Sequence, residues 1–289
     1  MQQSAITDSL LPIALGIIML GLGLSLTLAD FKRVLVYPRA IIVGLTTQTI
    51  LLPIICLVLA SITGLSPELS VGLMLLAASP GGATANLYSH LAKGDVALNI
   101  TLTAVNSLLS LLTLPLLVNF SLMYFLGEGQ YIPPQFKKIV EVASIILIPV
   151  AIGMFIRNRS QSFAEKMNRP VRIASVVILA GLIVAALLKD KSNVAHHFAQ
   201  VGLAAFLFNI TSMLIGYYLP LLFKVNRKQA IAIGMEIGIH NGTLAIFIAF
   251  NVLNNPTMSI PPAIYSLIMF FTAGIFGWFL AKKEETQAS

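Results

Sequence analysis

Long apolar runs separated by short polar gaps are the feature that most constrains the fold of this chain. Each run is close to the roughly 20 residues that a helix needs to cross a bilayer. Nine runs occur, at about 9–29, 40–62, 69–92, 95–120, 139–156, 171–188, 198–223, 229–253 and 261–281. Transmembrane strands would alternate apolar and polar residues, whereas stretches such as Ile173–Leu188 are apolar on every helical face. The pattern therefore predicts an all-α polytopic membrane protein with nine transmembrane helices.

Composition excludes most soluble functions. Only 10% of the residues are charged, against about 25% in soluble domains, and 57% are hydrophobic. A disulfide framework is excluded because Cys56 is the single cysteine. The net charge of +7 does not form a nucleic-acid-binding face, because the basic residues lie in short gaps between apolar runs. We therefore expect the lipid bilayer, and no nucleic acid, as a partner.

The basic residues predict the orientation of the chain in the membrane. With nine spans, 14 of the 18 Lys and Arg residues fall on the side that carries the C-terminal tail, and 4 fall on the other side. The positive-inside rule then places the C-terminus in the cytoplasm and the N-terminus outside. The expected location is the inner membrane of the cell.

A helix-breaking sequence interrupts the third run, 69–92. Pro80 removes a backbone donor and clashes with the preceding turn, and Gly81 and Gly82 can adopt positive φ. Irregular backbone at this depth is tolerated only against protein or a water-lined cavity. We therefore expect this helix to be broken near the middle of the membrane.

The eighth run, 229–253, contains a second interruption together with a carboxylate. Residues 234–243 hold three glycines and four polar side chains. Glu236 is the one acidic residue well inside a predicted span, where a charge costs about 2.5–3.5 kcal/mol even on insertion scales. An ionisable side chain at this depth predicts a functional site.

The two breaks take equivalent places in the two halves of the chain, since each is followed by one more span. Runs two to four (40–126) and seven to nine (198–281) thus form two three-helix units, with two spans (139–188) between them. That arrangement leaves the units in opposite orientations. It predicts inverted repeats whose broken helices cross near the midplane, which is typical of secondary transporters.

Polar residues in two further runs extend the predicted site. Gln48 is a polar residue within the second run. Four residues of the fourth run recur at spacings of four, three and four, which places them on one helical face: Asn99, Thr103, Asn106 and Ser110. Oxygen-rich side chains and one carboxylate suit a hard cation such as Na⁺.

Several segments resemble the bile acid:sodium symporter family over about residues 12–281. They are residues 15–26, 79–86, 91–98 and 236–241. The resemblance implies a core of two inverted repeats with crossed broken helices (69–92 and 229–253), beside a panel domain formed here by 9–29 and 139–188. It implies Na⁺-driven import of an organic anion by alternating access. Bacterial members commonly have ten spans, and this chain begins at what resembles their second.

The resemblance also implies ligand residues. One sodium site would use the Ala85 carbonyl with the side chains of Asn86, Asn99, Thr103 and Glu236. A second would use Gln48, Glu236, the carbonyls of Ile237 and Ile239, and position 240. The family usually has glutamine at that position and this chain has His240, so the second site is weakened or replaced by proton coupling. The substrate is expected at Thr84, Asn86, His240, Asn241 and Met269.

Other functions and simpler roles remain open at this stage. A proton-coupled or ion-independent solute carrier, a channel and an intramembrane enzyme are the alternatives. An enzyme is disfavoured because clustered metal ligands or a nucleophile–base pair are not visible in the runs. Asn86 and Asn241 could instead satisfy backbone groups freed by the breaks, and Asn106 and Ser110 could join helices to one another.

Overall fold

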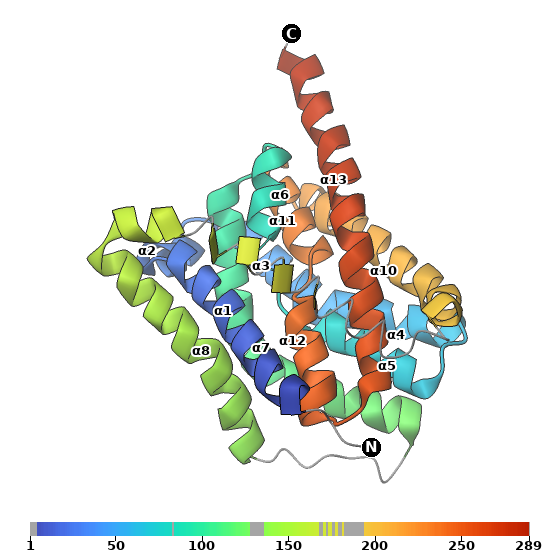
Figure 1. Cartoon of the computed structure of the whole chain (residues 1–289). Coiled ribbons are helices and arrows are strands. Elements are labelled where there is room, and N and C mark those ends of the chain that lie inside the picture. Colours follow the sequence, from blue (N-terminus) through green and yellow to red (C-terminus); the bar gives the residue numbers. More distant parts are fainter. Residues whose placement is uncertain are drawn as a thin grey trace.

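The computed structural model describes residues 5–82, 84–127, 136–167 and 194–288, with isolated positions between 170 and 181. Every regular element within them is a helix (Figure 1). Four helical segments are long and apolar enough to cross a membrane, and one bent pair also qualifies. The four are Pro38–Ile62, Val96–Leu126, Phe198–Leu222 and Pro256–Lys282. These segments confirm a helical, multi-pass membrane protein.

The helices follow one another closely along the chain. The first half contains α1 (Ala5–Ser25), α2 (Leu28–Lys32), a 3₁₀ turn (Arg33–Leu35), α3 (Pro38–Thr46), a π-helical turn (Thr47–Leu51), α4 (Leu52–Ile62), α5 (Pro67–Ala78), α6 (Ala85–Leu91) and α7 (Val96–Leu126). The rest contains α8 (Phe136–Arg159), α10 (Val194–Leu222), α11 (Arg227–Gly238), α12 (Gly242–Phe247), a π-helical turn (Ile248–Val252), a 3₁₀ turn (Pro256–Ser259) and α13 (Ile260–Ala288).

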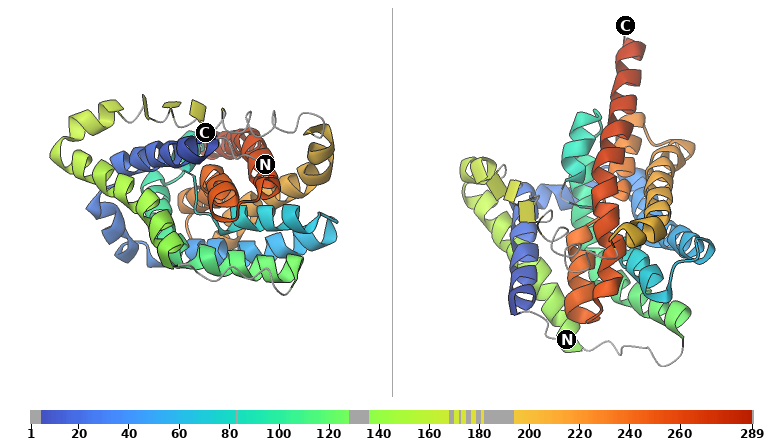
Figure 2. Two further views of the ribbon diagram at one scale, coloured as in Figure 1. Left: turned by 60° about the horizontal axis from the view of Figure 1, so that its bottom comes forward. Right: turned by 45° about the vertical axis from the view of Figure 1, so that its right-hand side comes forward.

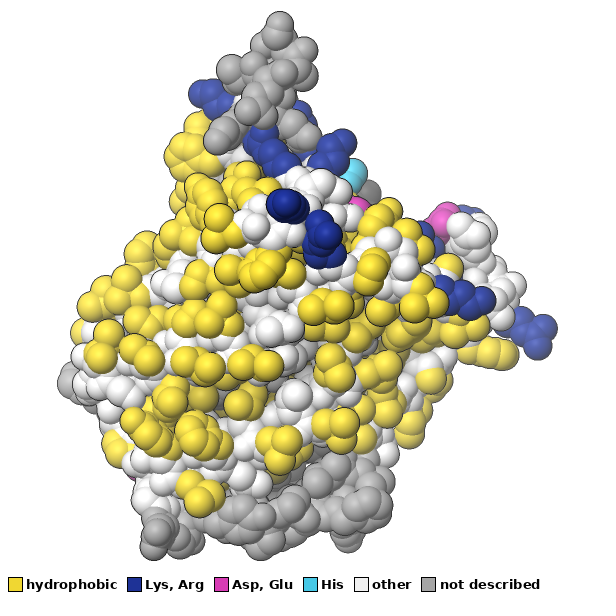
Figure 3. Space-filling model, turned by 180° about the vertical axis from the view of Figure 1, so that it is seen from behind, with side chains coloured by type: hydrophobic (Ala, Val, Ile, Leu, Met, Phe, Trp, Pro, Cys, Tyr) yellow, Lys and Arg dark blue, Asp and Glu magenta, His cyan; other side chains and the backbone are white. Residues whose placement is uncertain are grey.

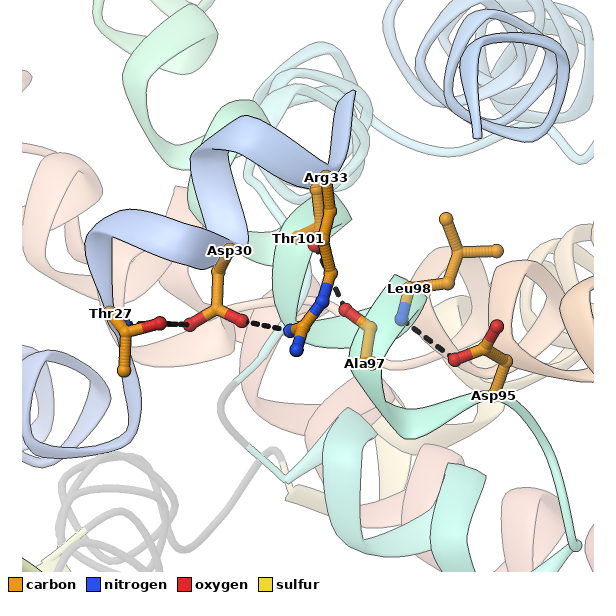
Figure 4. A network of polar contacts seen from close by, with 7 residues as sticks. All are labelled: Thr27, Asp30, Arg33, Asp95, Ala97, Leu98 and Thr101. Atoms are coloured by element: carbon orange, nitrogen blue, oxygen red, sulfur yellow. Dashed lines mark hydrogen bonds and ion pairs between the residues drawn. The ribbon is translucent and has the colours of Figure 1, made fainter. Parts of the chain in front are cut away.

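The first predicted span, 9–29, is bent near its end. The chain turns by 73° between the end of α1 and the segment that begins with α2. The side chain of Asp30 accepts hydrogen bonds from the backbone N–H and the hydroxyl of Thr27, both at 2.7 Å, and pairs with Arg33. Figure 4 shows this group lying over the first turns of α7. The local capping box therefore starts a new helix inside the apolar run.

Two helices are interrupted inside the molecule. The first interruption separates α5 from α6, where Ser79 and Pro80 leave the helical path. Pro80 has no N–H and disfavours helical geometry at the residue before it, so the helix ends at Ala78. The second separates α11 from α12, where Ile239 is extended and Asn241 caps the following helix.

The helices divide into two packed groups. α1 lies along α8 on one side (Figures 1 and 2), while α10 packs against both α11 and α13 on the other. α7 contacts both α8 and α11, and α12 contacts both α1 and α13, so these two helices connect the groups. The sixth predicted run, 171–188, lies mostly outside the described residues.

The surface is apolar over most of its height. On the face that Figure 3 draws, hydrophobic side chains cover the middle of the molecule, and Lys and Arg side chains lie toward the end at which α13 finishes. An apolar band bounded by basic residues at one end is the distribution that a bilayer requires.

Candidate ion and substrate site

The two helix breaks are joined to each other through their backbones. The N–H of Gly82 donates to the carbonyl of Ile239 at 2.6 Å, and the N–H of Asn241 donates to the carbonyl of Pro80 at 2.9 Å. Gly81 and His240 thus face each other as an antiparallel pair. These bonds satisfy polar backbone groups that water would otherwise have to reach in the interior of a membrane.

The carboxyl group of Glu236 lies directly against the first break. Glu236 is only 2% exposed. A Cβ atom added to Gly81 would lie 2.0 Å from Glu236 Oε1, so only glycine leaves room for the carboxyl in this position. The hydroxyl of Thr103, on α7, donates to Glu236 Oε2 at 2.6 Å. Three segments distant in sequence therefore meet at one carboxyl group.

Four buried oxygens of residues expected to bind sodium have no hydrogen-bond partner within the described part of the chain. They are Gln48 Oε1, Asn86 Oδ1, Asn99 Oδ1 and Glu236 Oε1. The amide of Asn99 donates through its nitrogen to the Ala232 carbonyl at 2.7 Å, which leaves its oxygen available. Unpaired buried acceptors are costly, and a cation would satisfy them.

The donor set fits Na⁺ better than a transition metal. Amide, hydroxyl and carboxylate oxygens are the ligands that hard cations prefer. Among the residues that the structure describes, no group of three or more His, Cys, Asp or Glu side chains could hold a metal ion. A single carboxylate among neutral oxygens carries one negative charge, which one monovalent cation would balance.

Gln48 and His240 form a second polar group beside the breaks. The Gln48 amide nitrogen donates to the Ser79 carbonyl at 3.2 Å and lies 3.4 Å from His240 Nδ1. The His240 ring stacks on Phe208 and meets Tyr265 edge-on, with centroids 5.7 and 5.4 Å away. Its Nε2 has no partner in the described residues. The structure thus brings Gln48 and His240 together.

Gln48 lies on the π-helical turn between α3 and α4. Such turns place an extra residue in the helix and occur frequently at functional sites. The Ile239 carbonyl, which was expected to face a second sodium ion, accepts the hydrogen bond from Gly82. That carbonyl therefore already has one donor.

The residues expected to bind substrate have different surroundings. Thr84 is half-buried at the start of α6, where its side chain makes no capping bond. Asn241 is buried, and its side-chain oxygen accepts from the Leu244 N–H at 3.0 Å, which leaves its amide nitrogen and one lone pair of that oxygen for a ligand. Met269 is buried on α13.

The polar face of α7 is used unevenly. Asn99, Thr103, Asn106 and Ser110 are all buried. Asn99 and Thr103 bond to α11, whereas the hydroxyl of Ser110 donates to a carbonyl of its own helix at 2.8 Å. Among the described residues, the side-chain hydrogen bonds from this face to α11 therefore come from its first half.

Three polar residues near the second break were missed by the sequence analysis. Asn209 Nδ2 and the Tyr265 hydroxyl each donate to the Gly238 carbonyl at 2.9 Å, and the Thr272 hydroxyl donates to Asn209 Oδ1. A signal was present, since Asn209 is an amide inside an apolar run and Tyr265 lies within the last run rather than at its end.

Comparison with known proteins places this site in context. Residues 12–197 match the model of the Sodium Bile acid symporter family. The chain is 27% identical over 276 residues to the "Uncharacterized sodium-dependent transporter YocS" of Bacillus subtilis, covering 96% of this chain and 84% of that one.

Two eukaryotic relatives show similar identity. One is the "Probable sodium/metabolite cotransporter BASS1, chloroplastic" of Arabidopsis thaliana, 26% identical over 88% of this chain. The alignment spans only 62% of that relative's length. The other is the "Hepatic sodium/bile acid cotransporter" of Rattus norvegicus, 26% identical over 91% of this chain and 71% of its own length.

Proposed function

This chain belongs to the sodium bile acid symporter family, and on that premise we propose that it imports an organic anion together with Na⁺ by alternating access. The family consists of transporters, so the chain is not an enzyme, and its sodium-dependent relatives support sodium as the coupling ion. The substrate that we propose is a monocarboxylate or a bile-acid-like anion. A proton-coupled or ion-independent carrier is the alternative.

The observation that carries the proposal is the Glu236 carboxyl at the meeting point of two broken helices. The first sodium ion would be held by Glu236 with the oxygens of Asn86, Asn99 and Thr103 and the Ala85 carbonyl. Support comes from the unpartnered oxygens of Asn86, Asn99 and Glu236. A bound Na⁺ would balance the buried negative charge.

A second ion is proposed to be weaker. Its ligands would be Gln48, Glu236, the carbonyls of Ile237 and Ile239, and His240. An imidazole is a poorer ligand for Na⁺ than an amide oxygen, because hard cations prefer oxygen. The free Gln48 Oε1 supports this site, while the bond from Gly82 to the Ile239 carbonyl weakens it.

The proposed architecture has nine spans. Repeats 40–126 and 198–281 form a core with crossed broken helices, and 9–29 with 139–188 form a panel against which the core moves. The backbone pairing of the two breaks and the separate packing of α1 on α8 support this division. The basic residues gathered toward one end support a cytoplasmic C-terminus, an external N-terminus and an inner-membrane location (Figure 3).

The substrate is proposed to bind beside the ions, contacted by Thr84, Asn86, His240, Asn241 and Met269. Apart from Arg172, the second residue of run 171–188, the apolar runs contain no Lys or Arg to pair with an anion. With two Na⁺ and ionised Glu236 the site would carry one net positive charge, which a monocarboxylate would neutralise. With one Na⁺ it would be neutral before the substrate arrives, which favours a zwitterion or a neutral solute instead.

Uptake into proteoliposomes tests the proposal. Labelled carboxylates from pyruvate-sized to sterol-sized would be offered under an inward Na⁺ gradient or an equal K⁺ gradient. We expect at least one to accumulate only with Na⁺, and Glu236→Gln to abolish that accumulation. Glu68→Gln is the matched control, because Glu68 lies in the first turn of α5, away from the breaks. Equal uptake in K⁺, or uptake driven by a pH gradient alone, would overturn sodium coupling.

A further inference from the structure

Two of the carbonyl groups at the end of α11, those of Ile237 and Gly238, have lost their helical donors. In a continuous helix the N–H of Asn241 would bond to the Ile237 carbonyl, and the N–H of Gly242 to the Gly238 carbonyl. Here Asn241 donates to Pro80 at 2.9 Å, and Gly242 donates to His240 at 3.0 Å. Both carbonyls therefore need other partners inside the membrane.

The Gly238 carbonyl receives two replacements from other helices. Asn209 Nδ2 on α10 and the Tyr265 hydroxyl on α13 each donate to it at 2.9 Å. The Thr272 hydroxyl donates to Asn209 Oδ1, which holds the amide with its nitrogen toward Gly238. We call Asn209, Tyr265 and Thr272 the Gly238 clamp. Asn209 and Tyr265 are fully buried, so water does not compete with these bonds.

The Ile237 carbonyl receives no side-chain donor in the described residues. It belongs to the C-terminal end of a 12-residue helix, where the helix dipole attracts a cation. It also lies one residue after Glu236, the buried carboxyl at the crossing of the breaks. The two carbonyls thus differ in what remains available to a cation.

We propose that the Gly238 clamp positions the second of the two proposed sodium sites by saturating the Gly238 carbonyl and leaving the Ile237 carbonyl directed at that Na⁺. The proposal rests on the sodium coupling proposed above. Without the clamp, Gly238 would lack donors and the last turn of α11 would lose its fixed orientation. Na⁺ would then have to order that turn on binding, which lowers its affinity. The clamp residues act through the backbone and are positioning residues.

Na⁺ binding to the purified full chain tests the proposal without a known substrate. The apparent dissociation constant for Na⁺ would be measured with radioactive Na⁺ at constant ionic strength, with choline replacing Na⁺. Tyr265→Phe removes one donor and keeps the ring against His240 and Phe208. We expect the constant to rise about 5-fold, the effect of one hydrogen bond, and about 25-fold when Asn209→Ala is added.

Three comparisons test whether the clamp residues position the Na⁺ site or only stabilise the fold. Tyr217→Phe is the matched control, because Tyr217 is another buried tyrosine, which packs edge-on against Phe276. Its Na⁺ constant should stay within 2-fold of the wild type, since roughly that scatter is expected for a change without a mechanism. Thr272→Val should weaken Na⁺ binding less than Tyr265→Phe, and Thr272→Ser should restore it. Thermal unfolding without Na⁺ records any purely structural loss.

The outcomes distinguish this inference from the function on which it rests. If the wild type fails to bind Na⁺, the proposed function fails and the clamp proposal fails with it. If the wild type binds Na⁺ and Tyr265→Phe and Thr272→Val bind it equally well or more tightly, the clamp proposal alone is overturned. If the Tyr265→Phe variant does not fold or express, the comparison of Thr272→Val with Thr272→Ser tests the clamp proposal instead.

Discussion

The two helix breaks contribute different chemistry to one site. The first, between α5 and α6, consists of Pro80, Gly81 and neighbouring residues, and supplies backbone groups and space. The second, between α11 and α12, follows Glu236 and supplies the charge. The carboxyl fits because a glycine faces it, with Glu236 Oε1 only 2.0 Å from where a Gly81 Cβ would lie. The two interruptions are thus similar in backbone structure but contribute different groups to the same site.

The surroundings of the two breaks differ as well. Every residue of α12 is buried, as is α11 from Gln229 onward. In α6 only Ala85 and Ser89 are buried, and Leu91 is 61% exposed. The charged break is therefore enclosed by protein, whereas the half-helix after the uncharged break reaches the surface. A buried charge needs the more complete enclosure, because its partners must all come from the protein.

Placing a side chain in the uncharged break should have the largest effect. Gly81→Ala puts a Cβ against the end of a flexible Glu236 side chain, so the carboxyl moves while the backbone stays. In enzymes a misplacement of about 1 Å lowers the reaction rate on the order of 100-fold, and we expect a loss of similar size in Na⁺ affinity here.

The melting temperature of Gly81→Ala should change little, since the moved group is a side-chain end. Gly202→Ala is its control, because a Cβ there meets nothing within 4 Å. Sodium binding by Gly81→Ala at the wild-type level would show that the fit between the two breaks has no functional role.

Removing the Thr103 hydroxyl, which donates from α7 to Glu236, should have the next largest effect on Na⁺ affinity. Thr103→Val leaves Glu236 Oε2 without the bond from Thr103, and hydrogen bonds to charged groups contribute about 1.5–3 kcal/mol. We expect the Na⁺ dissociation constant to rise at least about 10-fold.

Two matched variants test whether the effect of Thr103→Val comes from the lost hydrogen bond to Glu236. Thr103→Ser should keep near-normal binding because it retains the hydroxyl. Thr101→Val should have no effect on Na⁺, because the Thr101 hydroxyl donates to Ala97 within α7 (Figure 4). A Thr101→Val defect as large as that of Thr103→Val would argue against a specific role for the Glu236 contact.

Adding a Cβ atom at Gly242, the first residue of α12, should reduce the stability of the fold more than it reduces Na⁺ binding. A Cβ at Gly242 would lie 1.9 Å from Ser266 Oγ, and overpacking typically costs about 1–3 kcal/mol. Gly242→Ala should therefore lower the midpoint of thermal unfolding. Ser266→Ala removes the clashing oxygen, so the double variant should recover most of the loss. Additive effects of the two changes would disprove the assigned clash.

The smallest expected effect compares the caps of the two half-helices. Asn241 accepts from the Leu244 N–H, whereas Thr84 makes no capping bond at the start of α6. Asn241→Ala should lower the unfolding free energy by about 1 kcal/mol, with Asn241→Ser recovering part of it, whereas Thr84→Ala should be nearly neutral. Denaturant titration of purified protein measures both, and a larger loss at Thr84 would contradict this comparison.

Local signals predicted the helical class, the two breaks and Glu236 as a site residue. Proline and glycine act on the backbone at their own position, and an isolated carboxylate must be solvated at its own position. The effects of Pro80 and Glu236 can therefore be predicted without knowing which residues contact them. The bend after Ser25 had a signal in Thr27 and Asp30, but the apolar run continues through Leu28 and hid it.

Contacts between distant helices could not be predicted in this way. Asn99 and Ser110 share one face of α7, yet one bonds to α11 and the other to its own helix. Helical periodicity predicts which residues share a face of a helix, but it does not predict which other helix that face contacts. The bonds from Asn209 and Tyr265 to Gly238 likewise depend on how α10 and α13 pack, and packing is not periodic in sequence.

The backbone pairing of Gly81 with His240 has a consequence for biosynthesis. The ribosome delivers the second partner about 160 residues after the first. At the usual rate of about 5–20 residues per second, the first break waits roughly 8–32 s with polar groups unmatched. During that interval the nascent segment needs water, lipid headgroups or an insertion factor as a temporary partner. Quality control in the membrane therefore has a defined window in which to recognise chains that stop early.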